Sequence, residues 1–250
     1  MKQSRLTALA FCTAMVFFLT SCGGSDSEKK AAADSAAMAP ADTTAKAPEA
    51  VPANTIVTVP ETIVSVRHRI ANFTKWLASY EGHDSARLAA GLHNYVIGRG
   101  LMDTNMVLVA LRADDVAKAK SFIKDPGLKA AMAKGGVLGV PMISINTSFW
   151  QDTVHVNTTL RSMTMYAVKD HDAWFKAFQE GKQERLDNGI TDRVISNDVD
   201  DNKKMSLVTA VVDTAKAFAY YKSDALKARR AASGVVGVPT RFLFNIVKRY

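Results

Sequence analysis

The stretch "GGVLGVP" at residues 135–141 decides the fold, because nearly the same phrase, "SGVVGVP", returns 98 positions later at residues 233–239. The same interval relates other residues along the chain: Trp76 to Trp174, Arg87 to Arg185, Leu128 to Leu226, and Pro141 to Pro239. Similarity at a fixed interval is the signature of an internal repeat. The sequence therefore predicts a tandem duplication, with one copy at residues 58–150 and the other at residues 151–250.

Each copy has the pattern of four strands and two helices. In the first copy, the segment "TIVSVRHRI" (62–70) is rich in β-branched residues and alternates, which is typical of a strand. From Asn72 onward, apolar residues recur at the helical period. Further strands are expected at residues 94–100, 106–112 and 142–146, and a second helix starts at Asp114 and restarts at Asp125. The order is β-α-β-β-α-β, and the second copy repeats it.

This order is that of the ferredoxin-like unit, whose antiparallel sheet is covered by helices on one face only. The bare face of one copy is suited to cover the bare face of the other. The predicted fold is therefore α+β, with two tandem ferredoxin-like repeats that form an intramolecular dimeric α+β barrel. The protein is expected to be a monomer with this internal pseudo-dimer. Gly136 and Gly234 are expected to end helices in a left-handed conformation, which makes the repeated phrase a structural joint.

The N-terminal segment "MKQSRLTALAFCTAMVFFLTSC" (1–22) has a basic start followed by an apolar stretch. This stretch is too short for a membrane-spanning helix, so residues 1–21 are predicted to be a signal peptide. Its end resembles a bacterial lipobox, in which Cys22 is acylated; an ordinary secretory signal with an incidental cysteine is the alternative. The lipobox predicts a lipoprotein of the cell envelope, located in the outer membrane or at the periplasmic face. Palmitate-like acyl chains on Cys22 would bind it to membrane lipid.

Composition narrows the class of protein further. Residues 22–57 are rich in Ala, Pro, Asp, Thr and Lys and poor in large apolar side chains, which predicts a disordered tether. The net charge of +8 comes without a Lys/Arg run, so nucleic acid is not an expected partner. A single cysteine after the signal peptide and five scattered histidines give no metal-ligand spacing. We expect neither a metal nor a cofactor.

Two segments of the first copy resemble a known family: "VRHRIANFTKWLASYEGHDSARLAAGLHNYVIGRG" (66–100) and "MVLVALRADDVAKAKSFIKDPGLKAAMAKGGVLGVP" (106–141). They look like small dimeric α+β barrel proteins related in fold to the antibiotic-biosynthesis monooxygenases and sometimes labelled cyclase-like. The resemblance covers residues 64–141 well and residues 162–239 more weakly. It implies the fold and leaves the activity open, because this fold hosts cofactor-free oxygenases, isomerases, haem enzymes and simple binders.

Three polar residues of the first copy form the candidate catalytic group. His83 and Arg87 are four residues apart and share the helix side of Trp76 and Tyr80, which should be packed. His68 alternates with apolar neighbours on the first strand. The three side chains could meet where helix and sheet join, where an imidazole can move a proton and an arginine can hold a carboxylate or enolate. Alternatively, they satisfy each other and nearby carbonyls at the edge of the core.

The second copy keeps part of this group. Arg87 returns as Arg185, whereas His68 is replaced by Tyr166 and the other histidine by glycine. A retained arginine indicates a structural task, such as bonding carbonyls at a helix end. The histidines could then mark one functional half beside a degenerate half. Together with Trp76 and Tyr80, Arg185 and Tyr166 are candidate ligand-binding residues.

The remaining candidates are Arg67 and Arg69, which alternate on the opposite side of the first strand. Their counterparts in the second copy are Met165 and Ala167. If this side lines the barrel, the cavity is cationic on one wall and apolar on the other, which suits an amphiphilic anion; otherwise the arginines are solvated near an edge. The favoured function is non-catalytic, the binding of a small ligand or a surface role. The alternative is a cofactor-free monooxygenase-like or isomerase-like enzyme with one site in the first copy.

Overall fold

The computed structural model describes residues 54–250. The predicted signal peptide (1–21), the acylated Cys22 and nearly all of the predicted tether lie outside the described residues, and these assignments stay predictions. Ile56–Val57 forms β1, which pairs with the end of β5 (Val137–Asp152), so the sheet begins before the expected boundary at residue 58. Within the described part, no helix is long and apolar enough to cross a membrane.

The two halves have the same order of elements. The first contains β2 (Glu61–Ile70), α1 (Phe73–Gly82), α2 (Asp84–Ala89), β3 (Leu92–Gly100), β4 (Met106–Ala113), α3 (Val116–Phe122), α4 (Pro126–Lys134) and β5. The second contains β6 (Leu160–Val168), α5 (His171–Glu180), α6 (Lys182–Asp187), β7 (Ile190–Asp198), β8 (Lys204–Val211), α7 (Thr214–Lys222), α8 (Asp224–Ala232) and β9 (Val235–Arg249). The predicted α+β class is confirmed, with each predicted helix divided in two.

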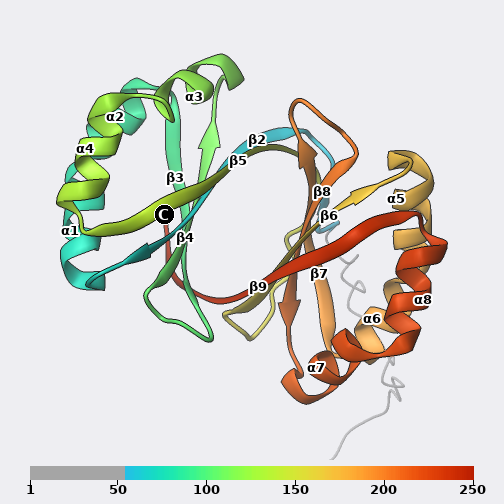
Figure 1. Ribbon diagram of the computed structural model, residues 1–250. Coiled ribbons are helices and arrows are strands. Elements are labelled where there is room, and N and C mark those ends of the chain that lie inside the picture. The colour runs from blue at the N-terminus through green and yellow to red at the C-terminus, as the bar shows by residue number, and fades with distance from the viewer. Residues whose placement is uncertain (1–53) are drawn as a thin grey trace, which may run out of the picture. The chain divides into compact units, whose positions relative to one another are not determined.

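The strands form one antiparallel sheet that closes on itself (Figure 1). β5 pairs with β2 of its own half over residues 137–148 and then with β7 of the other half over residues 146–151. β9 does the same in the second half, pairing with β6 over residues 235–245 and with β3 over residues 244–249. These two long strands join the halves into a barrel, which is the predicted intramolecular arrangement.

The helices cover the outer face of the sheet in each half, and Figure 1 shows them on opposite sides of the barrel. Apolar spacing explains this packing, because a helix with one apolar stripe buries that stripe against the sheet. Trp76 of α1 and Trp174 of α5 are almost fully buried at equivalent positions. Both α1 and α5 start at a capping side chain, since Asn72 and Asp170 accept hydrogen bonds from backbone N–H groups in the first turn.

Two predicted helix boundaries were wrong. The helix from Asn72 does not continue, because His83 leaves the helical conformation and separates α1 from α2. The next helix is capped by Asp115 rather than Asp114: the Asp115 side chain accepts a hydrogen bond from the N–H of Lys118 at 2.7 Å. The carboxylate of the neighbouring Asp114 instead forms a hydrogen bond with Nε2 of His93.

The repeated phrase has the left-handed glycines that were predicted after the second helices, Gly136 with φ of 79° and Gly234 with φ of 77°. However, the phrase belongs to the strand rather than preceding it, because β5 and β9 already begin at residues 137 and 235. Further glycines at positive φ, Gly139 and Gly237, accompany an interruption in the register of each strand. The joint is therefore a β-bulge inside a long strand.

Candidate functional site

The alternation of β2 sorts the predicted site residues between two faces of the sheet. Val66 and His68 point toward the helices of the first half and line a cavity there. Ser65 and Arg67 point to the other face, into the barrel interior. This follows from the period of two along a strand. The predicted residues thus belong to separate cavities.

All three candidate catalytic residues line the helix–sheet cavity of the first half, which has a volume of about 60 Å³ and an almost entirely apolar wall. His68 is 4% exposed, and both of its ring nitrogens lack a hydrogen-bond partner among the described residues. Its ring centroid lies 5.6 Å from that of Trp76. His83 lies nearer to the opposite wall, 6.2 Å from the ring of Phe122. No hydrogen bond joins the two histidines.

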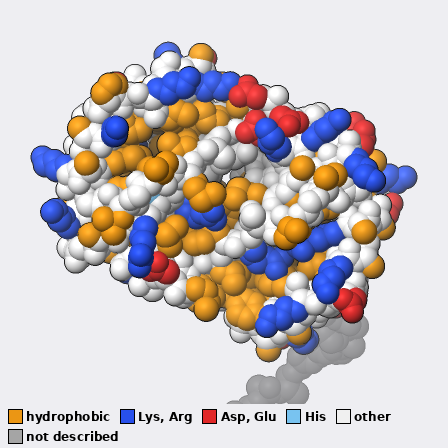
Figure 2. Space-filling model, viewed as in Figure 1, with side chains coloured by type: hydrophobic (Ala, Val, Ile, Leu, Met, Phe, Trp, Pro, Cys, Tyr) orange, Lys and Arg blue, Asp and Glu red, His pale blue; other side chains and the backbone are white. Residues whose placement is uncertain are grey.

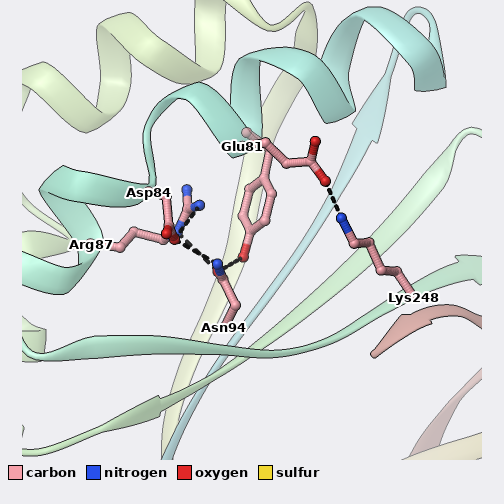
Figure 3. Close-up of polar contacts among 6 residues, drawn as sticks. Glu81, Asp84, Arg87, Asn94 and Lys248 are labelled. Atoms are coloured by element: carbon pink, nitrogen blue, oxygen red, sulfur yellow. Dashed lines mark hydrogen bonds and ion pairs between the residues drawn. The ribbon is translucent and has the colours of Figure 1, made fainter. Parts of the chain in front are cut away.

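Arg87 takes part in a polar network that holds its guanidinium in place (Figure 3). Its Nη2 donates to Asp84 Oδ1 at 3.1 Å, and its Nε donates to Asn94 Oδ1 at 3.1 Å. The Tyr80 hydroxyl donates to the same Asn94 oxygen, and the guanidinium lies 3.8 Å from the centre of the Tyr80 ring. The network ties α1 and α2 to β3. Arg87 is therefore positioned as a structural residue, and its positive charge is already paired with Asp84.

A second contact in the same view ties the other half to this helix. Lys248 of β9 forms an ion pair with Glu81 of α1 (Figure 3). Because β9 comes from the second half, this contact links the end of the chain to the helical layer of the first half.

The electrostatic state of His68 follows from its surroundings. Burial without a partner lowers the pKa of His68 to about 4, because the charged imidazolium loses its hydration and gains nothing in return. At neutral pH the imidazole is neutral. Its low pKa makes it a weak base, and Arg87 is already engaged, so the predicted catalytic group is not assembled as one unit.

We expect the folded state to lose stability in acid because of His68. The pKa is about 4 in the folded protein and about 6.5 in an unfolded chain, so the unfolded state binds more protons between these values. Stability due to this group is complete above pH 6.5 and falls as the pH drops, by about 2 kcal/mol at pH 5. Urea unfolding of a His68→Phe variant should lack this dependence, whereas replacement of the exposed His93 by Gln should retain it. Equal pH profiles for wild type and His68→Phe would contradict the assignment.

The helix–sheet cavity of the second half contains the other predicted pair, Tyr166 and Arg185. Arg185 is held by two short contacts to Asp192, Nε–Oδ1 at 2.7 Å and Nη2–Oδ2 at 2.6 Å, and it donates to the Phe178 carbonyl at 2.7 Å. Both charged side chains are buried. Burial raises the pKa of Tyr166 above its usual range, so its hydroxyl stays protonated. Arg185 is thus held through all three of its nitrogens, whereas its counterpart in the first half donates from two.

The two predicted barrel arginines have different positions. Arg67 lies inside the barrel, where its Nη2 contacts Met142 Sδ at 2.8 Å and its guanidinium lies 5.0 Å from the centre of the Phe242 ring. Arg69 does not line the interior, because it forms an exposed ion pair with Asp103 at 3.2 Å. Figure 2 draws one side of the molecule in the view of Figure 1. Hydrophobic and basic side chains lie next to one another across the middle of that side, where the surface is hollowed.

The largest cavity is the barrel interior, the lumen, with a volume of about 300 Å³. Three arginines line it: Arg161, Arg193 and Arg249. Sequence analysis missed all three, and the signal that could have found them is the repeat itself. Their counterparts in the first half are Ile63, Tyr95 and Gln151, which line the same cavity without a positive charge.

The three arginines of the lumen lack carboxylate partners among the described residues. Arg161 donates from Nη1 to the carbonyl oxygens of Thr158 and Leu160, at 2.8 and 3.0 Å. Burial, followed by the positive charges of Arg193 and Arg249, lowers the pKa of Arg161 to about 10. Among the described residues, none of the three arginines forms an ion pair with a carboxylate. The lumen therefore carries more positive than negative charge.

Asp152 is the one acidic residue among those lining the lumen. Its charge opposes the effect of burial on the pKa of Arg193, so it lies close enough to offset part of the positive charge. Its Oδ1 also accepts a hydrogen bond from the N–H of Val154. In the part of the chain that the structure describes, no cluster of His, Cys, Asp or Glu side chains could hold a metal ion.

Solved structures of other proteins share the fold of this chain. No protein-family model and no curated protein matches the chain. A protein from Fusobacterium nucleatum, provisionally assigned as a monooxygenase, has a similar structure, with a TM-score of 0.50 and 10% identity over 76% of this chain and 94% of that chain. A provisional monooxygenase from Lactobacillus acidophilus matches with a TM-score of 0.45 and 10% identity, over 75% and 93% of the two chains. At this identity the similarity shows the ferredoxin-like α+β fold and leaves the activity open.

A third structure also matches. It is a ferredoxin-fold protein from Listeria monocytogenes related to antibiotic-biosynthesis monooxygenases, with a TM-score of 0.43 and 6% identity, over 76% of this chain and 97% of that chain.

Proposed function

We propose that the protein is a non-catalytic binder of a small amphiphilic anion, which lies in the lumen of the barrel. The observation that carries this proposal is the group of three lumen arginines without ion-pair partners among the described residues. One of the three, Arg161, is buried, Arg193 is partly buried and Arg249 is exposed at the end of the cavity wall. Bringing like charges together is unfavourable, so an anion that enters the lumen gains from all of them. This role does not depend on the predicted lipid anchor at Cys22.

The remaining wall of the lumen suits an apolar tail. Leu108, Met163 and Phe244 are buried together in one apolar cluster that lines the cavity. Ser65, Leu108 and Met163 also line a smaller cavity beside it, into which Arg67 points. A lumen of this size, which combines an apolar cluster with convergent polar groups, has the character of a small-molecule site. The anionic group would meet the arginines, and the tail would lie along the apolar cluster.

The binding proposal predicts a charge-dependent loss of affinity when lumen arginines are removed. In an Arg161→Ile and Arg193→Tyr double variant, each residue takes the identity of its first-half counterpart. Calorimetry with octanoate should show at least about a tenfold loss of affinity, the value of one charge-assisted hydrogen bond. Octanol, which has the same tail without the charge, should bind weakly to wild type and to the variant alike.

A matched control is Arg69→Met, which removes one exposed arginine from a barrel strand outside the lumen. We expect it to bind octanoate within about twofold of wild type, which is inside the range of screened surface charges. Unchanged octanoate affinity in the double variant would overturn the proposal. So would an equal loss for octanol, since that would show a general disturbance of the cavity.

The alternative is a cofactor-free monooxygenase-like or isomerase-like enzyme that uses the first-half cavity. It is supported by the unpartnered His68, by His83 in the same cavity, and loosely by the names of structurally similar proteins. Against it stand the low pKa of His68 and the pairing of Arg87 with Asp84. Replacing both histidines separates the two proposals, because a lumen binder keeps its octanoate affinity and an enzyme loses turnover.

A further inference from the structure

The two helix–sheet cavities occupy the same place in the two halves but differ in chemistry. Their equivalence rests on strand register: Val64 pairs with Leu111 and Ile145, and Ser162 at the equivalent position pairs with the equivalent Thr209 and Leu243. The cavity volumes are also alike, at about 60 and 70 Å³. The first half therefore serves as an internal reference for the second.

Against this reference, the cavity of the second half has exchanged apolar side chains for polar ones. The exchanged pairs that line the two walls are Val64 and Ser162, Val66 and Thr164, Phe122 and Tyr220, Ile123 and Tyr221, and Met132 and Arg230. A further wall residue, Arg241, stands where the first half has Ile143. A cavity used only for packing would gain nothing from these changes, because each buried polar group costs free energy unless it finds a partner.

The positive charges of this cavity are only partly compensated. Two of its arginines have carboxylate partners: Arg185 pairs with Asp192, and Arg229 pairs with Glu184. Arg230 and Arg241 form no ion pair with any described residue, although both are substantially buried.

The surroundings of these two arginines offer tyrosines in place of carboxylates. Burial lowers the pKa of both guanidinium groups, to about 10 for Arg241, where the positive charge of Arg230 lowers it further. The side chains that oppose these shifts are tyrosines, Tyr166 and Tyr221 among them. A tyrosine hydroxyl is neutral at physiological pH, so two positive charges are left without a counter-charge from the described residues.

Polar atoms next to these arginines also lack partners. The Ser162 hydroxyl and the Tyr221 hydroxyl are fully buried and form no hydrogen bond within the described part. Arg241 lies 3.4 Å from the centre of the Tyr221 ring and has a single weak contact, from its Nε to the Thr164 hydroxyl at 3.3 Å. Ser162 is only 1% exposed. The cavity thus combines unpartnered hydroxyl groups with two guanidinium groups that have no carboxylate partner among the described residues, which suits a negatively charged hydrogen-bond acceptor.

We propose that the helix–sheet cavity of the second half is a binding site for a small oxyanion group, a phosphate, sulfate or carboxylate, held by Arg230 and Arg241 with the hydroxyls of Ser162 and Tyr221. Guanidinium groups are suited to planar or tetrahedral oxyanions because they donate paired hydrogen bonds. The cavity has room for a few water molecules, which matches a small anionic group rather than a large molecule. It shares no lining residue with the lumen, since Ser162 and Thr164 point to the opposite face of β6 from Arg161 and Met163.

The test is the binding of inorganic phosphate to the purified protein, followed by calorimetry. An Arg230→Met and Arg241→Ile double variant takes the residues of the first half, which the same fold already accommodates. We expect wild type to bind phosphate saturably and the double variant to lose at least about tenfold in affinity. Phenyl phosphate and benzoate are titrated in parallel. Tighter binding of inorganic phosphate indicates a free anion, tighter binding of phenyl phosphate indicates a phosphate ester, and tighter binding of benzoate indicates a carboxylate.

A matched control is Lys227→Met, which removes a positive charge from the same helix at an exposed position. It should leave phosphate binding within about twofold of wild type, because exposed charges are screened by salt. If the double variant does not fold, the single Arg230→Met variant serves in its place. Absence of saturable binding of all three anions to wild type would overturn the proposal, as would equal affinity in wild type and the double variant. The Arg161→Ile and Arg193→Tyr variant should keep phosphate binding here, so this site and the lumen site can fail separately.

Discussion

Replacing Asp192 by alanine is expected to lower the free energy of unfolding by about 3–5 kcal/mol, as is typical when one partner of a buried ion pair is removed. Asp192 and Arg185 are each more than nine-tenths buried, and two contacts of 2.6 and 2.7 Å join them. Without the carboxylate, the guanidinium keeps its hydrogen bond to the Phe178 carbonyl but loses its counter-charge. Urea unfolding followed by tryptophan fluorescence gives the measurement.

The repeat provides a graded control for this experiment. The first-half counterpart of Asp192 is Asn94, which contacts Arg87 through its amide oxygen, while Asp84 supplies the negative charge. Asp192→Asn should therefore cost less than Asp192→Ala, because the hydrogen-bond acceptor remains. Asp172 is almost fully exposed, and its replacement by alanine should have little effect. A loss below about 1 kcal/mol for Asp192→Ala would show that Arg185 finds another partner.

Arg87 and Arg185 also show which features of the site could be predicted from the sequence. The interval of 98 residues identified Arg87 and Arg185 as equivalent and pointed to a structural role, which their hydrogen bonds support. It did not show that their partners differ. Those partners are near in sequence: one lies in the same helix, three residues from Arg87, and the others lie seven residues from their arginine, in a neighbouring helix or strand. A contact between elements depends on how a helix breaks and where a strand starts, and the break at His83 was not visible in the apolar spacing.

The fold was predictable because it rests on period and order, which single residues hardly disturb. Alternation and helical spacing gave the strands, the helices and the ferredoxin-like class. The extent of β5 and β9 was underestimated, since glycine and proline inside "GGVLGVP" indicated a break where the structure has a bulge. These long strands close the barrel, so the error concerned the feature that creates the lumen.

The lumen arginines were missed for a related reason. Whether a strand residue faces inward is set by register, and a bulge reverses the faces beyond it. The sequence drew attention to Arg67 and Arg69, of which one lines the interior and the other forms an exposed ion pair. Arg161 and Arg193 lie in segments that show no distinctive motif. Comparing the two halves position by position would have drawn attention to them, because each stands where the first half has an uncharged residue.

Replacing Phe244 by alanine is expected to reduce the free energy of unfolding by about 3–5 kcal/mol and to enlarge the lumen. Phe244 is 3% exposed and packs with Leu108 and Met163. It also fills the seam where β9 meets β3, since a Cβ atom built on Gly98 would lie only 2.3 Å from the Phe244 ring. Removing a buried phenyl ring forfeits its transfer free energy and leaves a cavity. Urea unfolding measures this loss.

The same variant connects stability to the proposed ligand. If the tail of the anion lies against Phe244, the added space should improve the binding of dodecanoate relative to octanoate, because burying each further methylene contributes about 0.8 kcal/mol. Val238 lies on the same strand and is 92% exposed, so Val238→Ala should change neither stability nor chain-length preference. A loss of stability without a change in chain-length preference would confirm the packing role of Phe244 and would place the tail elsewhere in the lumen.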